Sequence, residues 1–525
     1  MKINFSDHFQ SLADQYPDRE ALVNVERNRR FTYSELHRIT NQIVNMMRNA
    51  LSLGQGDCFI NILDNDNMAL LHVPTIFKGD VTGAFTNFRD SLEEHIWQVE
   101  CAQAKVAFIE NSLIDSHYQM LRERGVTIVC MDPVEKTRDG MFYFWDLVEA
   151  ASDQNPDVEV DDRDHNALIR FTGGTTGKGK PAMYCVDNWI SIRDSFYALP
   201  DRVWNCETRL LHIAPISHGS GLLWLPAFYA GGCNLTLNEP DLVRYCQTIE
   251  KEQVTSAMLV PTILYRLLEL PEAQESDFSS LCNMFYGAAP MSPAKLVQLQ
   301  EKFGNIFIQV YASTEHPAIA LSLSKAAHRV TKPEDEARLA AAGQVTAGIE
   351  VVVKNSDGET VKSPDVGEIW IRSRATIQGY FKNPEQTETE FLNGYWKSGD
   401  IGYMDEQGYV YLVDRKKDMI ISGGFNVYAN EVEAAINAHD AILMSAVVGV
   451  PHEDWGEAVH AEVILRDGKS LDEIDLIQFV KEKLNTYKAP KTVAIVEQLP
   501  TSSVGKVLRR IVREKYWESS TRKVG

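Results

Sequence analysis

Apolar runs and amphipathic stretches alternate along the first half of the chain. The runs at 58–63, 105–110, 126–131, 167–172, 209–215, 234–238 and 256–261 have the length and the branched side chains of buried strands. The segments 242–252 and 293–303 carry apolar residues at helical spacing. Continuous apolar strands separated by helices predict α/β layers with a largely parallel sheet.

The pattern changes around residues 343–413. Short alternating runs at 349–359, 367–373 and 404–414 are joined or interrupted by the turn sequences Asn-Ser-Asp-Gly and Asp-Glu-Gln-Gly. Alternating strands with such turn residues are typical of antiparallel pairing. This part of the chain is therefore predicted to be rich in antiparallel β-structure.

A smaller unit of mixed structure follows the charged segment 414–418. The residues 430–438 and 475–484 read as helices, and 445–451 and 459–465 read as strands. We therefore predict an α/β protein with two domains, because a chain this long exceeds one compact core. The N-terminal domain, 1–414, combines layered α/β subdomains with a β-rich subdomain, and the C-terminal domain, 415–525, is a small mobile α+β unit.

Charge and cysteine content narrow the classes of partner. The chain has 73 acidic and 52 basic side chains and a formal net charge of −21, which disfavours nucleic acid and anionic lipid. Its eight cysteines include no Cys-x-x-Cys pair, so reduced thiols are expected rather than a disulfide framework or a zinc site. The start of the chain is polar, and no run of about 18 apolar residues occurs. A cytoplasmic protein without a membrane span is the expectation.

A loop rich in glycine, threonine and lysine follows the predicted strand 167–172. Residues 171–180 read Phe-Thr-Gly-Gly-Thr-Thr-Gly-Lys-Gly-Lys. Glycines let backbone N–H groups turn toward one ligand, hydroxyl groups donate hydrogen bonds, and ammonium groups offset negative charge. The loop therefore predicts a polyphosphate site. It is not a Walker loop, because its spacing is one residue short and Gly179 stands where Ser or Thr is needed.

This loop resembles the phosphate loop of the adenylate-forming superfamily, which includes acyl-CoA synthetases, adenylation domains and firefly-type luciferases. Thr172, Thr175, Thr176, Gly177 and Lys180 match the family pattern. The sequence departs from it where Gly173 replaces a serine, Gly179 a proline and Pro181 a glycine. The resemblance implies that the nucleotide phosphates are bound by Lys180 and the residues Thr172, Gly173, Gly174, Thr175, Thr176 and Gly177.

Three further segments resemble the family motifs in the family's order. Residues 214–221 resemble the motif whose histidine, here His218, lies beside the acyl pocket. Residues 286–290 resemble the segment on which adenine stacks, which implies nucleotide contacts for Gly287, Ala288, Ala289 and Pro290. Residues 311–315 resemble Tyr-Gly-x-Thr-Glu. The implied roles are nucleotide binding for Tyr311, Ala312 and Ser313, α-phosphate contact for Thr314, and magnesium binding for Glu315.

The remaining motifs lie around the predicted domain boundary and near the end of the chain. Residues 394–426 resemble the blocks in which Asp400 accepts hydrogen bonds from the ribose hydroxyls and Arg415 assists that contact. Lys417 matches the hinge, and Gly423 and Gly424 match the wall of the pantetheine tunnel. Residues 499–510 resemble the motif whose lysine, here Lys506, reaches into the active site during adenylation. Arg509 and Arg510 read as a solvated basic face.

The resemblance extends from Phe31 to Lys506 and implies a ligase that uses ATP, Mg²⁺ and coenzyme A. A small-molecule carboxylic acid would become an acyl-AMP and then a thioester. Two alternatives remain open: delivery of the acyl group to the phosphopantetheine of a carrier protein, and a nucleotide-binding homologue without catalysis. We expect Tyr286 and Ala312 to narrow the acid pocket, near Trp224 and His218, which favours a compact or aromatic acid. A homodimer is an option that the sequence does not decide.

Overall fold

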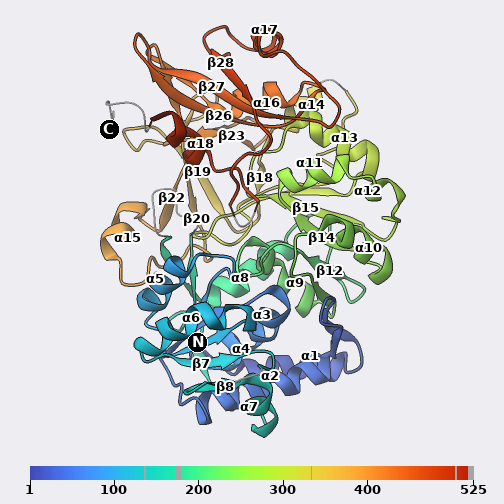
Figure 1. Ribbon diagram of the computed structural model, residues 1–525, viewed down its shortest axis with the longest axis vertical. Helices are drawn as coiled ribbons and strands as arrows, with labels where there is room; N and C mark the ends of the chain where they lie inside the picture. Colours follow the sequence, from blue (N-terminus) through green and yellow to red (C-terminus); the bar gives the residue numbers. More distant parts are fainter. Residues whose placement is uncertain (135–137, 173–178, 333, 503–504, 518–525) are drawn as a thin grey trace.

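The computed structural model describes the chain except for residues 135–137, 173–178, 333, 503–504 and 518–525. It confirms the α/β class, with a large N-terminal part and a smaller C-terminal part. In Figure 1 the chain runs from the blue N-terminal layers at the bottom, through the green middle, to the orange and red C-terminal part at the top.

The first sheet is almost entirely parallel. Residues in β4, β5 and β6 are buried along their whole length, as expected for strands covered on both faces. Among the described residues, the edge pair β10 and β11 is antiparallel and the other pairs of this sheet are parallel. The strand order is β11 (Pro181–Cys185), β10 (Asn166–Phe171), β5 (Thr82–Phe85), β4 (Cys58–Ile62), β6 (Val106–Ile109), β7 (Thr127–Cys130) and β8 (Met141–Tyr143).

The second sheet changes character along its width. Its first half is parallel, from β13 (Cys233–Thr236) through β12 (Arg209–His212), β14 (Ser256–Leu259) and β15 (Asn283–Gly287) to β16 (Phe307–Tyr311). On the far side of β13 lie β2 (Glu20–Asn24) and β3 (Arg29–Thr32).

Beyond β16 every pairing of this second sheet is antiparallel, which confirms the predicted β-rich region. The strands there are β17 (Leu321–Leu323), β18 (Gly343–Val345), β23 (Tyr409–Arg415), β22 (Tyr395–Met404), β20 (Gly367–Arg372) and β19 (Glu350–Lys354), with β21 (Phe391–Leu392) beside β22. A separate short pair joins β1 (Lys2–Ile3) to β9 (Val160–Asp161).

Helices cover these sheets, and their sequences explain where they begin. The helix after β3 starts at a capping box, in which Thr32 accepts a hydrogen bond from the Glu35 amide and Glu35 accepts one from the Thr32 amide. The helices α10 and α13 have the predicted bounds. In chain order they are α1 (Phe5–Gln15), α2 (Tyr33–Asn49), α3 (Asn65–Leu71), α4 (Val73–Lys78), α5 (Leu92–Ala102), α6 (Ile114–Glu123), α7 (Phe144–Ala150), α8 (Val186–Tyr197), α9 (Trp224–Tyr229), α10 (Leu242–Glu252), α11 (Pro261–Glu269), α12 (Glu272–Glu275), α13 (Pro293–Phe303), α14 (Glu334–Arg338) and α15 (Pro384–Glu390), with 3₁₀ turns at Asn111–Leu113 and Gly219–Leu223.

The C-terminal part has its own sheet and its own apolar core. Val432 and Ile436 on a helix pack with Val447 and Val459 on the sheet, and all four are buried. The elements are β24 (Ile420–Ser422), β25 (Phe425–Val427), α16 (Ala429–Asn437), β26 (Ile442–His452), β27 (Gly456–Leu465), α17 (Glu473–Lys483), β28 (Thr492–Ile495) and α18 (Arg509–Trp517).

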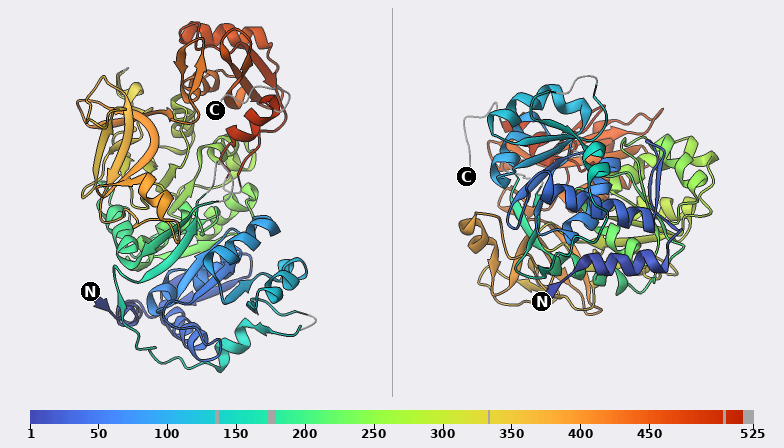
Figure 2. Two further views of the ribbon diagram at one scale, coloured as in Figure 1. Left: turned by 90° about the vertical axis from the view of Figure 1, so that its left-hand side faces the viewer. Right: turned by 90° about the horizontal axis from the view of Figure 1, so that it is seen from below.

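This C-terminal part packs on the large one and lies above it in the left view of Figure 2. Met444 and Val512 belong to the same apolar cluster as Leu264 of α11. Polar contacts fix the same interface: the Lys295 ammonium donates to the Ile442 carbonyl oxygen at 2.7 Å. The Arg466 guanidinium lies 2.9 Å from the Glu269 carboxylate. None of the helices in the described ranges has the length and apolar content needed to cross a bilayer.

Candidate functional site

A cavity of about 2530 Å³ opens between the large part and the C-terminal part. Its floor is formed where parallel strands end, the edge at which ligands bind in open α/β sheets. Thr172 follows β10, Ala214 comes shortly after β12, and Val260 follows β14. Ala288 and Ala312 follow β15 and β16. The segments after β12, β14, β15 and β16 meet because these strands lie side by side in the second sheet, and the loop after β10, in the first sheet, borders the same cavity.

The two ends of the phosphate-type loop are joined to each other. The Thr172 amide donates to the Lys180 carbonyl oxygen at 2.9 Å, and the Lys180 amide donates to Thr172 Oγ1 at 2.9 Å. The Lys180 ammonium lies 2.7 Å from the Glu390 carboxylate and 3.4 Å from Glu315. Both Thr172 and Lys180 line the cavity. Gly173, Gly174, Thr175, Thr176 and Gly177 lie outside the described residues.

Glu315 is held in place by hydroxyl groups. Ser313 Oγ donates to its Oε2 at 2.6 Å, and the Glu315 amide donates back to Ser313 Oγ at 2.9 Å. The Tyr380 hydroxyl lies 2.8 Å from Oε1. The neighbouring Thr314 also lines the cavity, and its carbonyl oxygen accepts from the Tyr184 hydroxyl.

No cluster of three metal-ligating side chains occurs in the part of the chain that the structure describes. The single carboxylate of Glu315 fits an ion of the Mg²⁺ type, which takes one or two protein carboxylates and completes its shell with phosphates and water. The site therefore suits a metal that is bound together with a nucleotide.

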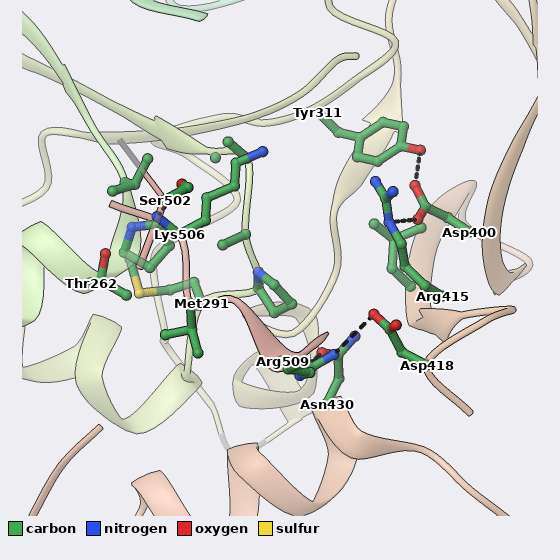
Figure 3. Close-up of a pocket in the computed structure, with 18 of the residues that line it drawn as sticks. Thr262, Met291, Tyr311, Asp400, Arg415, Asp418, Asn430, Ser502, Lys506 and Arg509 are labelled. Carbon is green, nitrogen blue, oxygen red and sulfur yellow. Dashed lines mark hydrogen bonds and ion pairs between the residues drawn. The ribbon is translucent and has the colours of Figure 1, made fainter. Parts of the chain in front are cut away.

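Asp400 and Arg415 face each other across two paired strands. They are direct partners in the β22–β23 register, and Arg415 Nε lies 2.9 Å from Asp400 Oδ1. The Tyr311 hydroxyl donates to the other carboxylate oxygen of Asp400. Figure 3 shows this group on one side of the pocket and Lys506 on the other. Asp400 is buried, so a fixed acceptor is presented to a ligand.

Lys506 enters the cavity from the C-terminal tail. The preceding residue, Gly505, is tied to the large part, since Thr262 Oγ1 donates to its carbonyl oxygen at 2.6 Å. Burial lowers the pKa of the Lys506 ammonium to about 8, with a further contribution from the charge of Arg415, against the opposing influence of Asp400 and Glu315. Lys506 is thus electrostatically coupled to the groups that lie across the pocket.

His218 lines the cavity next to a tight turn. Its Nδ1 lies 2.9 Å from Ser217 Oγ, and its carbonyl oxygen accepts from the Gly221 amide. A Cβ at Gly221 would stand 1.9 Å from the Ile216 carbonyl oxygen, so this turn requires glycine. Burial, with the charges of Arg170 and Lys506, lowers the pKa of His218 to about 3. The imidazole is therefore neutral at pH 7.

The segment 287–290 forms a flat wall of small residues. Gly287, Ala288, Ala289 and Pro290 all line the cavity. A Cβ at Gly287 would lie 2.1 Å from the Val310 carbonyl oxygen, which explains the glycine. Ala288 has a left-handed backbone, with φ of 67°, a conformation that non-glycine residues adopt mostly where surrounding structure enforces it.

Two expectations about the acid pocket are wrong. Tyr286 does not narrow the pocket, because its side chain is fully buried in the core and its hydroxyl bonds to Gln309 and His328. Side chains on successive strand residues point to opposite faces, and Gly287 rather than Tyr286 borders the cavity. Trp224 is also fully buried, against His72 and His212, and does not line the cavity.

The residues that match the hinge and the pantetheine tunnel differ in their position relative to the cavity. Lys417 borders the cavity, whereas Gly423 and Gly424 form the exposed turn between β24 and β25 and do not border it.

The expectation that Arg509 belongs to a solvated basic face is wrong. Its guanidinium lies 2.5 Å from Glu433 and 3.2 Å from Asp414, so it links the end of β23 to α16. Arg510 is half-exposed and pairs with Glu514 one turn along the helix.

Sequence reasoning missed several residues that form the site. Tyr380, Glu390 and Thr262 carried no local signal, because their partners are distant in sequence. Arg170 did carry a local sequence signal, because it is a charged residue inside the apolar strand β10. It lines the cavity.

Comparison with known proteins agrees with this arrangement. The AMP-binding enzyme family matches residues 9–381, and the AMP-binding enzyme C-terminal domain matches residues 431–506. The medium/long-chain-fatty-acid–CoA ligase FadD8 of Mycobacterium tuberculosis is 35% identical over 68% of this chain and 62% of its own length. Feruloyl-CoA synthase of an Amycolatopsis species is 33% identical over 70% of this chain and 73% of its own length. The structure of ATP-bound MatB from Rhodopseudomonas palustris aligns with a TM-score of 0.86 and 27% identity, and covers 98% of this chain and 99% of MatB.

Proposed function

Because this chain belongs to the AMP-binding enzyme family, we propose that it is an ATP-dependent carboxylic acid:CoA ligase. In the first step the acid carboxylate attacks the α-phosphorus of ATP, which gives an acyl-AMP and releases pyrophosphate. In the second step the CoA thiol attacks the acyl carbon, which gives a thioester and releases AMP. The acyl phosphate supplies the leaving group that a free carboxylate lacks.

The observation that carries this proposal is the position of Lys506 in the same cavity as Asp400, Arg415 and Glu315. Attack of a carboxylate on a phosphate joins two anions, so positive charge must be placed where they meet. The Lys506 ammonium can bridge the attacking carboxylate and the α-phosphate. Lys180 and the amides of the 172–177 loop would hold the other phosphates.

The remaining site residues would orient the nucleotide. Asp400 is buried and presents a carboxylate, which suits the two hydroxyl groups of a ribose, and Arg415 fixes that carboxylate from the side. Tyr311 and the wall 287–290 would hold the adenine between an aromatic ring and small residues. Thr314 would contact the α-phosphate. Glu315 would hold Mg²⁺ at the phosphates, and the ion would offset their charge when bound.

The second step requires a different arrangement of the C-terminal domain, 415–525. The boundary proposed at 414/415 lies where β23, of the large sheet, ends and before β24, of the small sheet, begins. A turn about Lys417 would withdraw Lys506 and bring the loop of Gly423 and Gly424 to the cavity as the path for the thiol. This two-state element would separate the half-reactions.

A compact or aromatic acid remains the substrate class that we propose, on different grounds from the sequence prediction. Tyr286 contributes nothing to the pocket, but Ala312 and Phe196 border it, together with His218. The names of the relatives differ in the acid, since one acts on fatty acids and the other on ferulate. A clear preference for palmitate over short and aromatic acids would contradict this part of the proposal.

Incubation with ATP, Mg²⁺ and an acid library, read as pyrophosphate release with and without CoA, tests the function. The expected result is acid-dependent pyrophosphate release and, with CoA, formation of thioester and AMP. Pyrophosphate release without thioester would indicate another acceptor, such as a carrier-protein phosphopantetheine. The absence of pyrophosphate with every acid would favour a nucleotide-binding protein without catalysis.

A further inference from the structure

Arg170 is a buried cation in the floor of the cavity. It belongs to β10, whose alternation puts Arg170 on the opposite face from Ile169 and Phe171, which pack in a separate apolar cluster. Its side chain faces the cavity instead, and the residue is 5% exposed. An arginine stays protonated even when buried, so this position carries a permanent positive charge.

The protein uses few of the hydrogen-bond donors of this guanidinium. Its Nε and Nη2 donate to one acceptor, the Ser217 carbonyl oxygen, at 2.9 and 2.7 Å. Its central carbon lies 5.7 Å from the Tyr184 ring centroid. A guanidinium has five N–H groups in a planar fork, so the contacts to Ser217 leave most of them for another partner.

No Asp or Glu in the described residues forms an ion pair with Arg170, and residues 173–178 of the adjoining loop contain no acidic side chain. Other cations at the cavity wall do have such partners: Arg415 lies 2.9 Å from Asp400, and Lys180 lies 2.7 Å from Glu390. Buried charges in proteins are normally paired. The missing partner of Arg170 is therefore expected in a ligand.

Arg170 lies beside the histidine that borders the cavity. It bonds to Ser217, directly before His218, and its charge contributes to keeping His218 neutral. Lys506 also acts on His218, but its own ionisation responds to Arg415, Asp400 and Glu315. Both cations, Arg170 and Lys506, are therefore close enough to His218 to influence its ionisation, and the family resemblance implies that His218 lies beside the acyl pocket.

We propose that Arg170 binds a second anionic group of the acid, so that the preferred substrates are compact acids with a second carboxylate a few bonds from the reacting one. This inference rests on the proposed ligase function. The planar fork of an arginine matches a carboxylate with two parallel hydrogen bonds. Lys506 would meet the reacting carboxylate, and the apolar side chains of Phe196, Leu222 and Met258 would border the carbon skeleton between the two groups.

The test compares matched pairs of acids, butanoate with succinate and benzoate with phthalate, by kcat/KM for acid-dependent pyrophosphate release. The wild-type enzyme should prefer the dicarboxylate of at least one pair. Arg170→Met should reduce that preference on the order of 100-fold, because a charge-assisted contact to the second carboxylate is lost. Arg170→Lys, which keeps the charge, should retain part of the preference, and Arg244→Met, a control on an exposed arginine paired with Glu26, should retain all of it.

Each other outcome overturns the inference in a distinct way. An equal loss on both acids of a pair would show that Arg170 only supports the turn of Ser217 and His218. A wild-type preference for the monoacids would show that Arg170 does not bind a second anionic group of the substrate. The proposed ligase function would still hold in that case, because pyrophosphate is still released. Absence of pyrophosphate with every acid would overturn both proposals. If circular dichroism shows that Arg170→Met is unfolded, the inference is tested by two other measurements. These are the preference of the wild-type enzyme for the dicarboxylate and the part of that preference that Arg170→Lys retains.

Discussion

Thr262 Oγ1 donates a hydrogen bond of 2.6 Å to the carbonyl oxygen of Gly505, across 243 positions of the chain. Thr262 is at the start of α11 in the large part, and Gly505 immediately precedes Lys506. This contact therefore couples the position of the tail lysine to the floor of the cavity. If Lys506 acts in adenylation, the contact belongs to the adenylation arrangement and must break before thioester formation.

Thr262→Val should slow adenylation about 5- to 10-fold, because one hydrogen bond contributes roughly 1 kcal/mol. The measurement is acid-dependent pyrophosphate release under single-turnover conditions. The reaction of preformed acyl-AMP with CoA should not slow. Thr248→Val is the matched control, since that hydroxyl bonds only within its own helix, to the Arg244 carbonyl oxygen. Equal slowing in both half-reactions would contradict the coupling.

Lys506→Ala should reduce acyl-AMP formation by about 100- to 1,000-fold, the range for removal of one preorganised group that stabilises transition-state charge. Preformed acyl-AMP should still react with CoA, because Lys506 has withdrawn by that step. The two half-reactions are measured separately, by pyrophosphate release and by thioester formation. Arg510→Ala, which removes an exposed cation of the same tail, serves as the control. A comparable loss in thioester formation would rule out the two-arrangement mechanism.

The pH dependence of adenylation should report the ionisation of Lys506. Its pKa is lowered to about 8, so the ammonium is present below this pH and is lost as the pH rises through it. The expected kcat/KM for ATP, which reports the free enzyme, falls about tenfold for each pH unit above that value. Lys506→Arg should move this decline in kcat/KM to higher pH, since a guanidinium keeps its proton. If the decline occurs at the same pH in this variant, it is caused by the ionisation of another group.

Glu315→Gln should raise the Mg²⁺ concentration needed for half-maximal adenylation by about tenfold or more, because a neutral amide is a poorer ligand for a hard cation. Glu388→Gln removes a carboxylate from the exposed face of α15 and is the matched control. Titration of MgCl₂ at fixed ATP gives the measurement. If the Mg²⁺ requirement is unaltered and only the maximal rate is reduced, Glu315 is not a ligand of the metal ion.

Much of the fold could be predicted from the sequence, because its elements have strong local patterns. The helices α10 and α13 begin and end where apolar periodicity places them. The strands β4, β12 and β14 lie within the apolar runs that predicted them. The motif residues Thr172, Ala288 and Glu315 could be located as well, because each follows a strand or short turn with its own composition.

Side-chain direction could not be predicted in the same way. Tyr286 and Gly287 are neighbours in β15, yet one is buried in the core and the other borders the cavity. A shift of one residue along a strand reverses the face to which a side chain points. The sequence gives no independent register for that strand, so the prediction that Tyr286 narrows the pocket had no structural basis.

The sequence by itself determined which chemical groups are available: the threonine and glycine loop, the acidic residues Glu315 and Asp400, and a lysine near the end of the chain. Only the tertiary structure decided that Lys506 shares a cavity with them, that Arg509 links β23 to α16, and that Arg170 faces the cavity without an acidic partner among the described residues. Local composition sets secondary structure over a few residues. Contacts between residues hundreds of positions apart depend on how the two sheets and the C-terminal part pack together.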